Sequence, residues 1–480
     1  MRLAPHMRGS LATLSLALLV LLVLISLASA DSPDAANTGA EAAGTPPVGR
    51  LVQPRGPDGC VHRKAVNRCA RGRFVTSPED VVVSPDGRHV YVASFGSHAI
   101  AVFARARRTG YLRQLGGIRG CVRHQPQDLR IRGCTRARAL GGPVAIALSP
   151  DGRNVYVAAA GSDALSVFAR NRRTGALRQL AGGAGCFSQR SGAGCTPVRA
   201  LNEPTSIAVS PDGSRVYVTG RRFPSAVAIF TRAGDGSLRQ PAGPAGCVSH
   251  RGGSDCAVAR ALSSPEEVAV TPDSRHVLVA GMRSRAVAVL TAGPNGLSQA
   301  PGADGCIALG GGAEGCASGR ALLGPVDLAI SPDGRWAYVA SSVADAVAVL
   351  HRDRTTGALT QPRGRRGCLG QGTGARRCVP GRALDEPWGI ALSPDGRSLY
   401  VVSAKINTLA AATRDRENGR LTQLPGRFGC FIRAGGFGCP EGRGLTVAVS
   451  VAVSPDGRNV YVVSEDGYLG SVAVFRRSVR

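Results

Sequence analysis

Three acidic residues stand at one equivalent position in three copies of an internal repeat, and their chemistry is that of a cation site. Asp80, Glu267 and Asp327 each lie where an inner β-strand is expected to begin. Hard divalent cations prefer oxygen ligands, so three convergent carboxylates predict a site for an ion such as Ca²⁺. The alternative, which we favour, is that the three carboxylates are solvated and balance nearby arginines.

Four arginines in two variable loops form the second candidate site. Arg221, Arg222, Arg283 and Arg285 come from adjacent repeats. Guanidinium groups bind carboxylate, sulfate or phosphate with paired hydrogen bonds, so the four predict a basic patch that holds an anionic ligand. Loop variation without any ligand is the more common explanation of such differences.

The sequence contains no complete catalytic constellation. It lacks a Gly-x-Ser-x-Gly nucleophile elbow, a phosphate-binding loop and a His-Glu-x-x-His metal motif. His98, in the first variable loop, has a side chain that could act as a base beside Asp80. A lone exposed histidine more often has no such role, so we expect ligand binding rather than catalysis.

An arginine follows the second cysteine of every repeat by four residues. Such a ring of guanidinium groups could present positive charge to an anionic ligand. A residue needed in all seven repeats is better explained as scaffold, so we expect these side chains to bond loop carbonyls or a neighbouring carboxylate. The set is Arg73, Arg138, Arg199, Arg260, Arg320, Arg382 and Arg443.

The fourteen cysteines fall as one pair per repeat. An even number of cysteines behind an export signal indicates disulfides, and the constant register makes pairing within each repeat the expected connectivity. The spacing does not match that of zinc sites. The predicted pairs are Cys60–Cys69, Cys121–Cys134, Cys186–Cys195, Cys247–Cys256, Cys306–Cys316, Cys368–Cys378 and Cys430–Cys439.

The repeat itself predicts the elements that carry these residues. The phrase Ser-Pro-Asp-Gly, or its variant Thr-Pro-Asp-Ser, recurs every 60 to 65 residues and is a tight turn between two apolar strands. In the first copy the strands are expected at 81–84, 89–94 and 99–104, followed by an outer Leu-x-Gln strand at 112–114. Four antiparallel strands per unit in seven units predict an all-β fold, a seven-bladed β-propeller.

The two ends of the chain complete one blade between them. The last repeat stops after its third strand, and residues 49–53 match the outer strand at 419–423. We therefore expect the N-terminal strand to join the C-terminal blade and close the ring, which removes an exposed sheet edge.

The first thirty residues have the pattern of a secretory signal peptide. Arg2 and Arg8 precede an apolar run at 11–27, and small residues follow at 28–30. Residues 31–47 are expected to be a disordered linker and 48–480 the propeller. A cleaved signal places the chain outside the cell, in the periplasm or on the envelope, with no membrane span in the mature protein; an uncleaved anchor is the alternative.

The net charge of +27 comes almost entirely from arginine, since the chain has only two lysines. The arginines are scattered through every repeat instead of forming one run. Together with export, this distribution argues against a nucleic-acid partner, and an acidic envelope component fits better. We expect a monomer.

The repeated phrase also resembles a known family. Ser84-Pro85-Asp86-Gly87-Arg88-His89-Val90-Tyr91-Val92, with Tyr217-Val218-Thr219-Gly220 as a variant, is similar to the YVTN-type repeats of the lactonase-like seven-bladed propellers. That superfamily includes 6-phosphogluconolactonase. The resemblance covers about residues 48 to 480 and implies a propeller fold, with hydrolysis of lactones or related esters as an activity to consider.

These observations lead to two functional hypotheses. The first is an exported, disulfide-stapled propeller that binds a ligand or partner at the channel face without chemistry of its own. An anionic small molecule, a glycan or an envelope component would be the ligand. The alternative is a lactone or ester hydrolase, assisted by a divalent cation at the three carboxylates.

Overall fold

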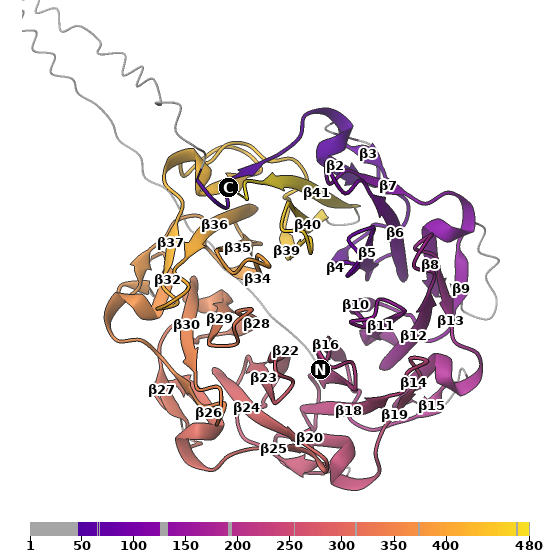
Figure 1. The fold of residues 1–480 in the computed structure, drawn as a ribbon, viewed down its shortest axis with the longest axis vertical. Helices are drawn as coiled ribbons and strands as arrows, with labels where there is room; N and C mark the ends of the chain where they lie inside the picture. Colours follow the sequence, from indigo (N-terminus) through magenta and orange to yellow (C-terminus); the bar gives the residue numbers. More distant parts are fainter. Residues whose placement is uncertain are drawn as a thin grey trace, which may run out of the picture. The chain divides into compact units, whose positions relative to one another are not determined.

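Seven small β-sheets are arranged side by side in a ring (Figure 1). The computed structural model describes residues 47–479 except 65, 67, 125–132, 191–193, 254, 313, 373–374 and 467–468. Pro46–Arg480 is one compact unit of the chain. The expected signal peptide and almost all of the expected linker lie outside the described residues. The predicted all-β, seven-bladed propeller is confirmed.

The first blade shows how each sheet is built. Its strands are β4 (Pro78–Val83), β5 (His89–Ser94), β6 (Ala99–Arg105), β7 (Leu112–Gln114), β8 (Cys121–His124) and β9 (Thr135–Ala137). β7 and β8 both pair antiparallel with β6, and the 3₁₀ helix η2 (Gly117–Gly120) lies between them. The predicted fourth strand is therefore divided into two segments, and β9 adds a short parallel strand at the edge.

The other blades follow the same order from the channel outwards. The second has β10 (Pro143–Leu148), β11 (Asn154–Ala159), β12 (Ala164–Arg170), β13 (Leu177–Gln179), β14 (Cys186–Ser188) and β15 (Thr196–Pro197). The third has β16 (Pro204–Val209), β17 (Arg215–Gly220), β18 (Ala226–Arg232), β19 (Leu238–Arg239), β20 (Cys247–Ser249) and β21 (Ala257–Val258). The fourth has β22 (Pro265–Val270), β23 (His276–Gly281), β24 (Ala286–Gly293), β25 (Gly296–Ser298), β26 (Cys306–Leu309) and β27 (Ala317–Gly319).

The last three blades include the two ends of the described chain. The fifth has β28 (Pro325–Ile330), β29 (Trp336–Ser341), β30 (Ala346–Arg352), β31 (Leu359–Thr360), β32 (Cys368–Gly370) and β33 (Val379–Pro380). The sixth has β34 (Pro387–Leu392), β35 (Ser398–Ser403), β36 (Thr408–Arg414), β37 (Leu421–Gln423) and β38 (Cys430–Ile432). The seventh has β39 (Ala448–Val453), β40 (Asn459–Asp466) and β41 (Leu469–Arg477), with β1 (Leu51–Val52), β2 (Cys60–His62) and β3 (Ala70–Arg71).

Short 3₁₀ helices connect several of these strands. Those between the two outer segments are η1 (Gly56–Gly59), η4 (Gly182–Gly185), η5 (Gly243–Gly246), η6 (Gly302–Gly305), η8 (Gly364–Gly367) and η10 (Gly426–Phe428), besides η2. Two more, η3 (Ala160–Ser162) and η7 (Ser342–Ala344), lie between second and third strands.

The N-terminal strands close the ring as predicted. Leu51 of β1 pairs with Arg477 of β41, and Val61 of β2 pairs with Val472 of the same strand. Figure 1 shows indigo β2 beside yellow β41. The chain ends thus share one sheet, so the propeller cannot open without breaking strand pairing.

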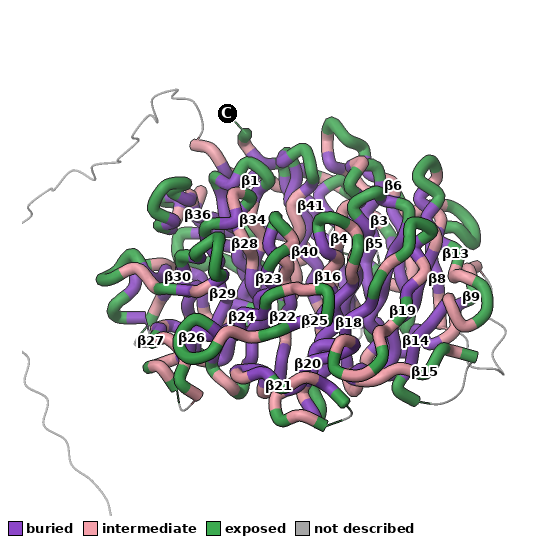
Figure 2. Tube along the Cα trace, turned by 60° about the horizontal axis from the view of Figure 1, so that its bottom comes forward, coloured by how far each residue is buried: buried purple, intermediate pink, exposed green. Residues whose placement is uncertain are grey.

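The apolar strands pack blade against blade. Tyr91, Ile100 and Val102 of the first blade form one buried cluster with Val155 and Phe168 of the second. Figure 2 shows the strands buried and the connecting loops exposed. Both faces of each sheet are covered, which explains why the strands are nearly continuous apolar runs instead of alternating ones.

All seven predicted disulfides are present. Each one joins the first residue of the second outer segment to the cysteine after the following loop, with Cα atoms 4.7 to 5.1 Å apart. The pairs are Cys60–Cys69, Cys121–Cys134, Cys186–Cys195, Cys247–Cys256, Cys306–Cys316, Cys368–Cys378 and Cys430–Cys439.

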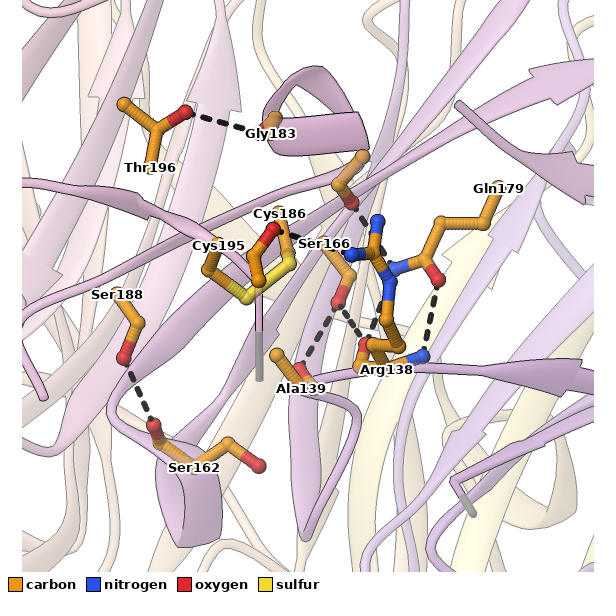
Figure 3. The surroundings of a disulfide bond; sticks show 12 residues. Arg138, Ala139, Ser162, Ser166, Gln179, Gly183, Cys186, Ser188, Cys195 and Thr196 are labelled. Atoms are coloured by element: carbon orange, nitrogen blue, oxygen red, sulfur yellow. Dashed lines mark hydrogen bonds between the residues drawn. A yellow bond between two sulfur atoms is a disulfide. The ribbon is translucent and has the colours of Figure 1, made fainter. Parts of the chain in front are cut away.

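The arginine after each disulfide fixes the loop, as expected. The Arg138 guanidinium donates to the carbonyls of Gly182 and Gly194, while its backbone N–H donates to Gln179 of the outer strand (Figure 3). The Gln179 amide donates back to the Arg138 carbonyl. The corresponding arginine of every repeat donates to the first residue of such a 3₁₀ helix: Arg73, Arg138, Arg199, Arg260, Arg320, Arg382 and Arg443.

A buried guanidinium joins neighbouring blades on the opposite face. Arg170, at the end of β12, forms two 3.0 Å hydrogen bonds with Asp86 of the preceding blade's turn. Its Nε donates to the Tyr91 hydroxyl, which donates to the Gly175 carbonyl. We call this arrangement the blade clamp. Its ion pairs are Arg105–Asp456, Arg170–Asp86, Arg232–Asp151, Arg352–Asp273, Arg414–Asp333 and Arg477–Asp395.

Removing one clamp hydroxyl should destabilise the propeller. Tyr91→Phe leaves the buried Arg170 Nε and the Gly175 carbonyl without their partner, at an expected cost of about 1 to 3 kcal/mol. Chemical denaturation would measure the free energy of unfolding. Tyr111→Phe is the control, because that hydroxyl has no hydrogen bond to a described residue. Equal stabilities of the two variants would show that the clamp hydroxyl contributes nothing.

Candidate functional site

The central channel opens into a cavity of about 1480 Å³ lined by the inner strands and adjoining loops. Nine acidic residues and four basic ones line it. The channel mouth is therefore acidic in a protein whose net charge is +27. The acidic residues are Glu79, Asp80, Asp163, Glu203, Glu266, Glu267, Asp327, Glu386 and Glu465; the basic ones are Arg190, Arg221, Arg222 and Lys405.

Asp80 satisfies backbone groups that the inner strands leave unpaired. The pairing of β4 with β5 shifts between Pro78 and Asp80. The Asp80 carboxylate accepts hydrogen bonds from the Val81 N–H at 2.7 Å, from the Ile146 N–H of the next blade at 3.0 Å and from the Ser450 hydroxyl at 2.9 Å. Burial raises its pKa even though these bonds act to lower it. The side chain thus connects three blades.

Glu267 and Asp327 occupy the same position in the fourth and fifth blades, each three blades away from Asp80 around the ring. The Asp327 carboxylate accepts a 2.7 Å hydrogen bond from the Ile390 N–H, and burial raises its pKa to about 7. Burial, followed by repulsion from Asp327, raises the pKa of Glu267 well above its usual value. Asp80, Glu267 and Asp327 all line the channel cavity.

The predicted cation site concerns three carboxyl groups that all line the channel cavity. No group of three His, Cys, Asp or Glu side chains in the described part of the chain has the geometry to hold a metal ion. Asp80 and Asp327 instead accept hydrogen bonds from the blades. A divalent cation at Asp80, Glu267 and Asp327 stays a prediction.

Glu79 is a candidate that the sequence did not single out. Burial, then repulsion from Glu465 and from Asp80, raises the pKa of Glu79 to about 7. Its carboxyl group has no hydrogen bond or ion pair with another described residue. The only sequence signal was the Glu79-Asp80 pair at the start of an inner strand. A carboxyl group that changes charge near neutral pH in a cavity can serve as an acid or a base.

The structure divides the predicted arginine patch into two pairs. Arg221 and Arg222 line the channel mouth, and both form ion pairs with Glu203. Arg221 also lies 3.6 Å from Glu266. Arg283 and Arg285 are exposed and do not belong to the cavity lining. Carboxylates therefore offset the charge of the first pair, and anion binding by the four stays a prediction.

His98 has a structural partner. Its Nδ1 accepts a 2.9 Å hydrogen bond from the Gly142 N–H at the start of the next blade. Equivalent loop residues in other blades accept from the equivalent N–H in the same way, so we name them the seam acceptors. Because its Nδ1 is occupied, His98 is better explained as a seam acceptor than as a base beside Asp80. The set is His98, Asp163, Ser225, Asp345 and Asn407.

Two aromatic side chains lie exposed at the channel mouth. Trp388, one of only two tryptophans in the chain, is 38% exposed, and its ring N–H donates to Glu386 at 3.3 Å. Phe95 is 40% exposed and also lines the cavity. Small-molecule sites combine aromatic and apolar surface with a few placed polar groups, and Trp388 with Glu386 provides both kinds of surface.

Comparisons with known proteins agree with this architecture. The family model "Lactonase, 7-bladed beta-propeller" matches residues 69–186. The chain has the lactonase-like seven-bladed propeller fold. No curated protein matches it.

Solved structures resemble this lactonase-like propeller at low identity. A putative 6-phosphogluconolactonase from Bacteroides fragilis is 19% identical, with 72% of this chain and 83% of that one covered and a TM-score of 0.50. The periplasmic gluconolactonase PpgL of Pseudomonas aeruginosa is 18% identical, with 79% and 94% covered and a TM-score of 0.50. At such identities the likeness concerns the fold alone.

The location of the lactonase-like propeller follows in part from its chemistry. Seven disulfides are consistent with an extracellular, oxidising compartment. Among the residues that the structure describes, no helix has the length and apolar character needed to cross a membrane. The predicted signal peptide and its apolar run at 11–27 lie outside those residues.

The stability of the lactonase-like propeller should depend on the protonation of Glu79. Its pKa is about 7 in the folded state and about 4.5 when unfolded, so folding favours the protonated form. This contribution is complete below about pH 4.5 and is lost as the pH rises through about 7. Thermal unfolding of the protein should therefore occur at lower temperature at about pH 8 than at about pH 5.

Replacing Glu79 tests how much of the pH dependence of unfolding comes from its carboxyl group. Glu79→Gln should make the unfolding temperature less dependent on pH between these two values, while Asp80, Glu267 and Asp327 retain part of the dependence. Glu417→Gln, at an exposed site, is the matched control. An unchanged pH dependence in Glu79→Gln would show that Glu79 does not titrate in this range.

Proposed function

We propose that this lactonase-like propeller is an exported binding protein that takes a hydroxyl-rich ligand, a glycan or a sugar-derived molecule, at the channel mouth. The supporting observation is Trp388, which lies exposed on the cavity wall with its ring N–H held by Glu386. An aromatic ring packs against the apolar face of a sugar, and carboxylates accept hydrogen bonds from hydroxyl groups.

The charge of the cavity supports a neutral ligand in preference to an anionic one. Acidic side chains, several of them with raised pKa values, outnumber basic ones by more than two to one along the lining. Arg221 and Arg222, which line the cavity, already pair with Glu203. An anionic ligand would have to displace these carboxylates, whereas hydroxyl groups can donate to them.

Binding should depend on the tryptophan ring. Trp388→Ala is expected to weaken glycan binding about tenfold or more, which corresponds to about 1.4 kcal/mol of binding energy. A glycan array with the purified propeller would identify a ligand, and calorimetry would measure its affinity. Phe437→Ala, at another exposed aromatic residue outside the cavity, is the control. Equal affinity of the two variants, or no glycan retained by the wild type, would contradict the proposal.

Hydrolysis of a lactone is the second candidate, and Glu79 favours it. A carboxylate whose pKa is about 7 can accept a proton from a water molecule that attacks a lactone carbonyl. The description of the matching family model supports testing this substrate class. In this function the channel would hold the sugar lactone, with Glu79 as the base.

A pH profile distinguishes this activity from binding alone. Turnover of aldonic acid lactones above the buffer rate should rise as the pH increases through about 7, because Glu79 must be deprotonated, and Glu79→Gln should abolish it. Glu465→Gln removes a neighbouring like charge, so its profile should shift to lower pH. A parallel assay with a chelator tests cation assistance. No turnover, or an unchanged rate in Glu79→Gln, would exclude Glu79 as the base.

A further inference from the structure

The seam acceptors follow one geometric rule. Each is the last residue of the loop between the second and third strands of its blade. Its side chain accepts a hydrogen bond from the backbone N–H of the residue just before the inner strand of the next blade. His98 accepts from Gly142, Asp163 from Glu203 and Asn407 from Val447. These residues share a left-handed backbone, with φ between 44° and 58° for these three. The rule predicts an acceptor at every seam between blades.

The seam between the fourth and fifth blades breaks this rule. Arg285 occupies the acceptor position, with φ of 51°. A guanidinium has five donors and no acceptor. The N–H that it should satisfy belongs to Gly324, which is buried, and no hydrogen bond joins this N–H to a described residue. A donor side chain therefore stands where a backbone donor needs an acceptor.

Exposed side chains flank this seam. Arg283 and Arg285 are both exposed, and neither forms an ion pair with a described carboxylate. Val343, beside Gly324, is 59% exposed. By contrast, Arg221 and Arg222 in the preceding blade are paired with Glu203. The two arginines of the fourth blade are thus the unpaired half of the predicted patch.

We propose that the Arg285 guanidinium and the Gly324 N–H bind a carboxylate group of a small ligand such as a sugar acid. One carboxylate oxygen can accept from the backbone N–H while the guanidinium donates to the carboxylate, so a single group satisfies both donors. Arg283 adds a second positive charge at the edge of the site. None of these residues lines the channel cavity, so the site is independent of the glycan site proposed above.

Charge-matched variants test the site directly. Calorimetry at constant ionic strength would measure binding of sodium glucuronate, with neutral glucose and inorganic phosphate as comparison ligands. Glucuronate should bind to the wild type and to Arg458→Asn, a change at an exposed arginine on the Ser-Pro-Asp-Gly turn face. Arg285→Asn should weaken its binding at least tenfold. Equal affinity in Arg285→Asn, or phosphate binding without glucuronate binding, would overturn the proposal.

The unliganded protein offers a second test. Arg285→Asn supplies the acceptor that Asn407 provides two seams away, and asparagine tolerates a left-handed backbone better than arginine. The unfolding temperature of the ligand-free variant should therefore rise above that of the wild type and no longer respond to glucuronate. An unfolding temperature equal to or below that of the wild type would show that the Gly324 N–H does not need a further acceptor. Trp388→Ala should retain glucuronate binding, which separates this site from the channel.

Discussion

The blade clamp is the interaction on which the geometry of the ring depends. Burial alone would raise the pKa of Asp86, yet hydrogen bonds from Ser84, the Arg88 N–H and Arg170 hold it at about 2. The carboxylate therefore stays charged opposite a guanidinium that has no exposed surface. Breaking such a buried pair leaves an unpaired charge, which is far more costly than the net gain from forming it. The clamp thus specifies how one blade sits on the next.

At one seam a different arginine joins the two neighbouring blades. Between the third and fourth blades Ala292 stands where the clamp arginine would be, and Asp212 forms no ion pair with a described arginine. Arg215 of the third blade instead donates to the Gly293 carbonyl at 2.6 Å and interacts with the Tyr217 hydroxyl. The guanidinium comes from the opposite side of the seam and still joins the two blades.

The channel face uses polar side chains for a different purpose. Inner strands have an unpaired edge, and Asp80 and Asp327 accept hydrogen bonds from its N–H groups. The seam acceptors do the same at the loops. Many polar side chains on this face therefore already form hydrogen bonds that hold the blades together. The groups that do not are the better candidates for a site: the Glu79 carboxyl, the Trp388 ring and the Arg285 guanidinium.

The sequence alone determined the repeat, its turns, the ring closure and all seven disulfides, because each depends on local spacing that recurs along the chain. The candidate site depends on contacts that spacing does not encode. Asp80 meets Ser450 across 370 residues, and the pKa of Glu79 reflects burial and Glu465 of another blade. Only the closed ring brings these groups together and excludes water from them. The tertiary structure therefore decided which acidic and basic side chains are scaffold and which are free to bind or react.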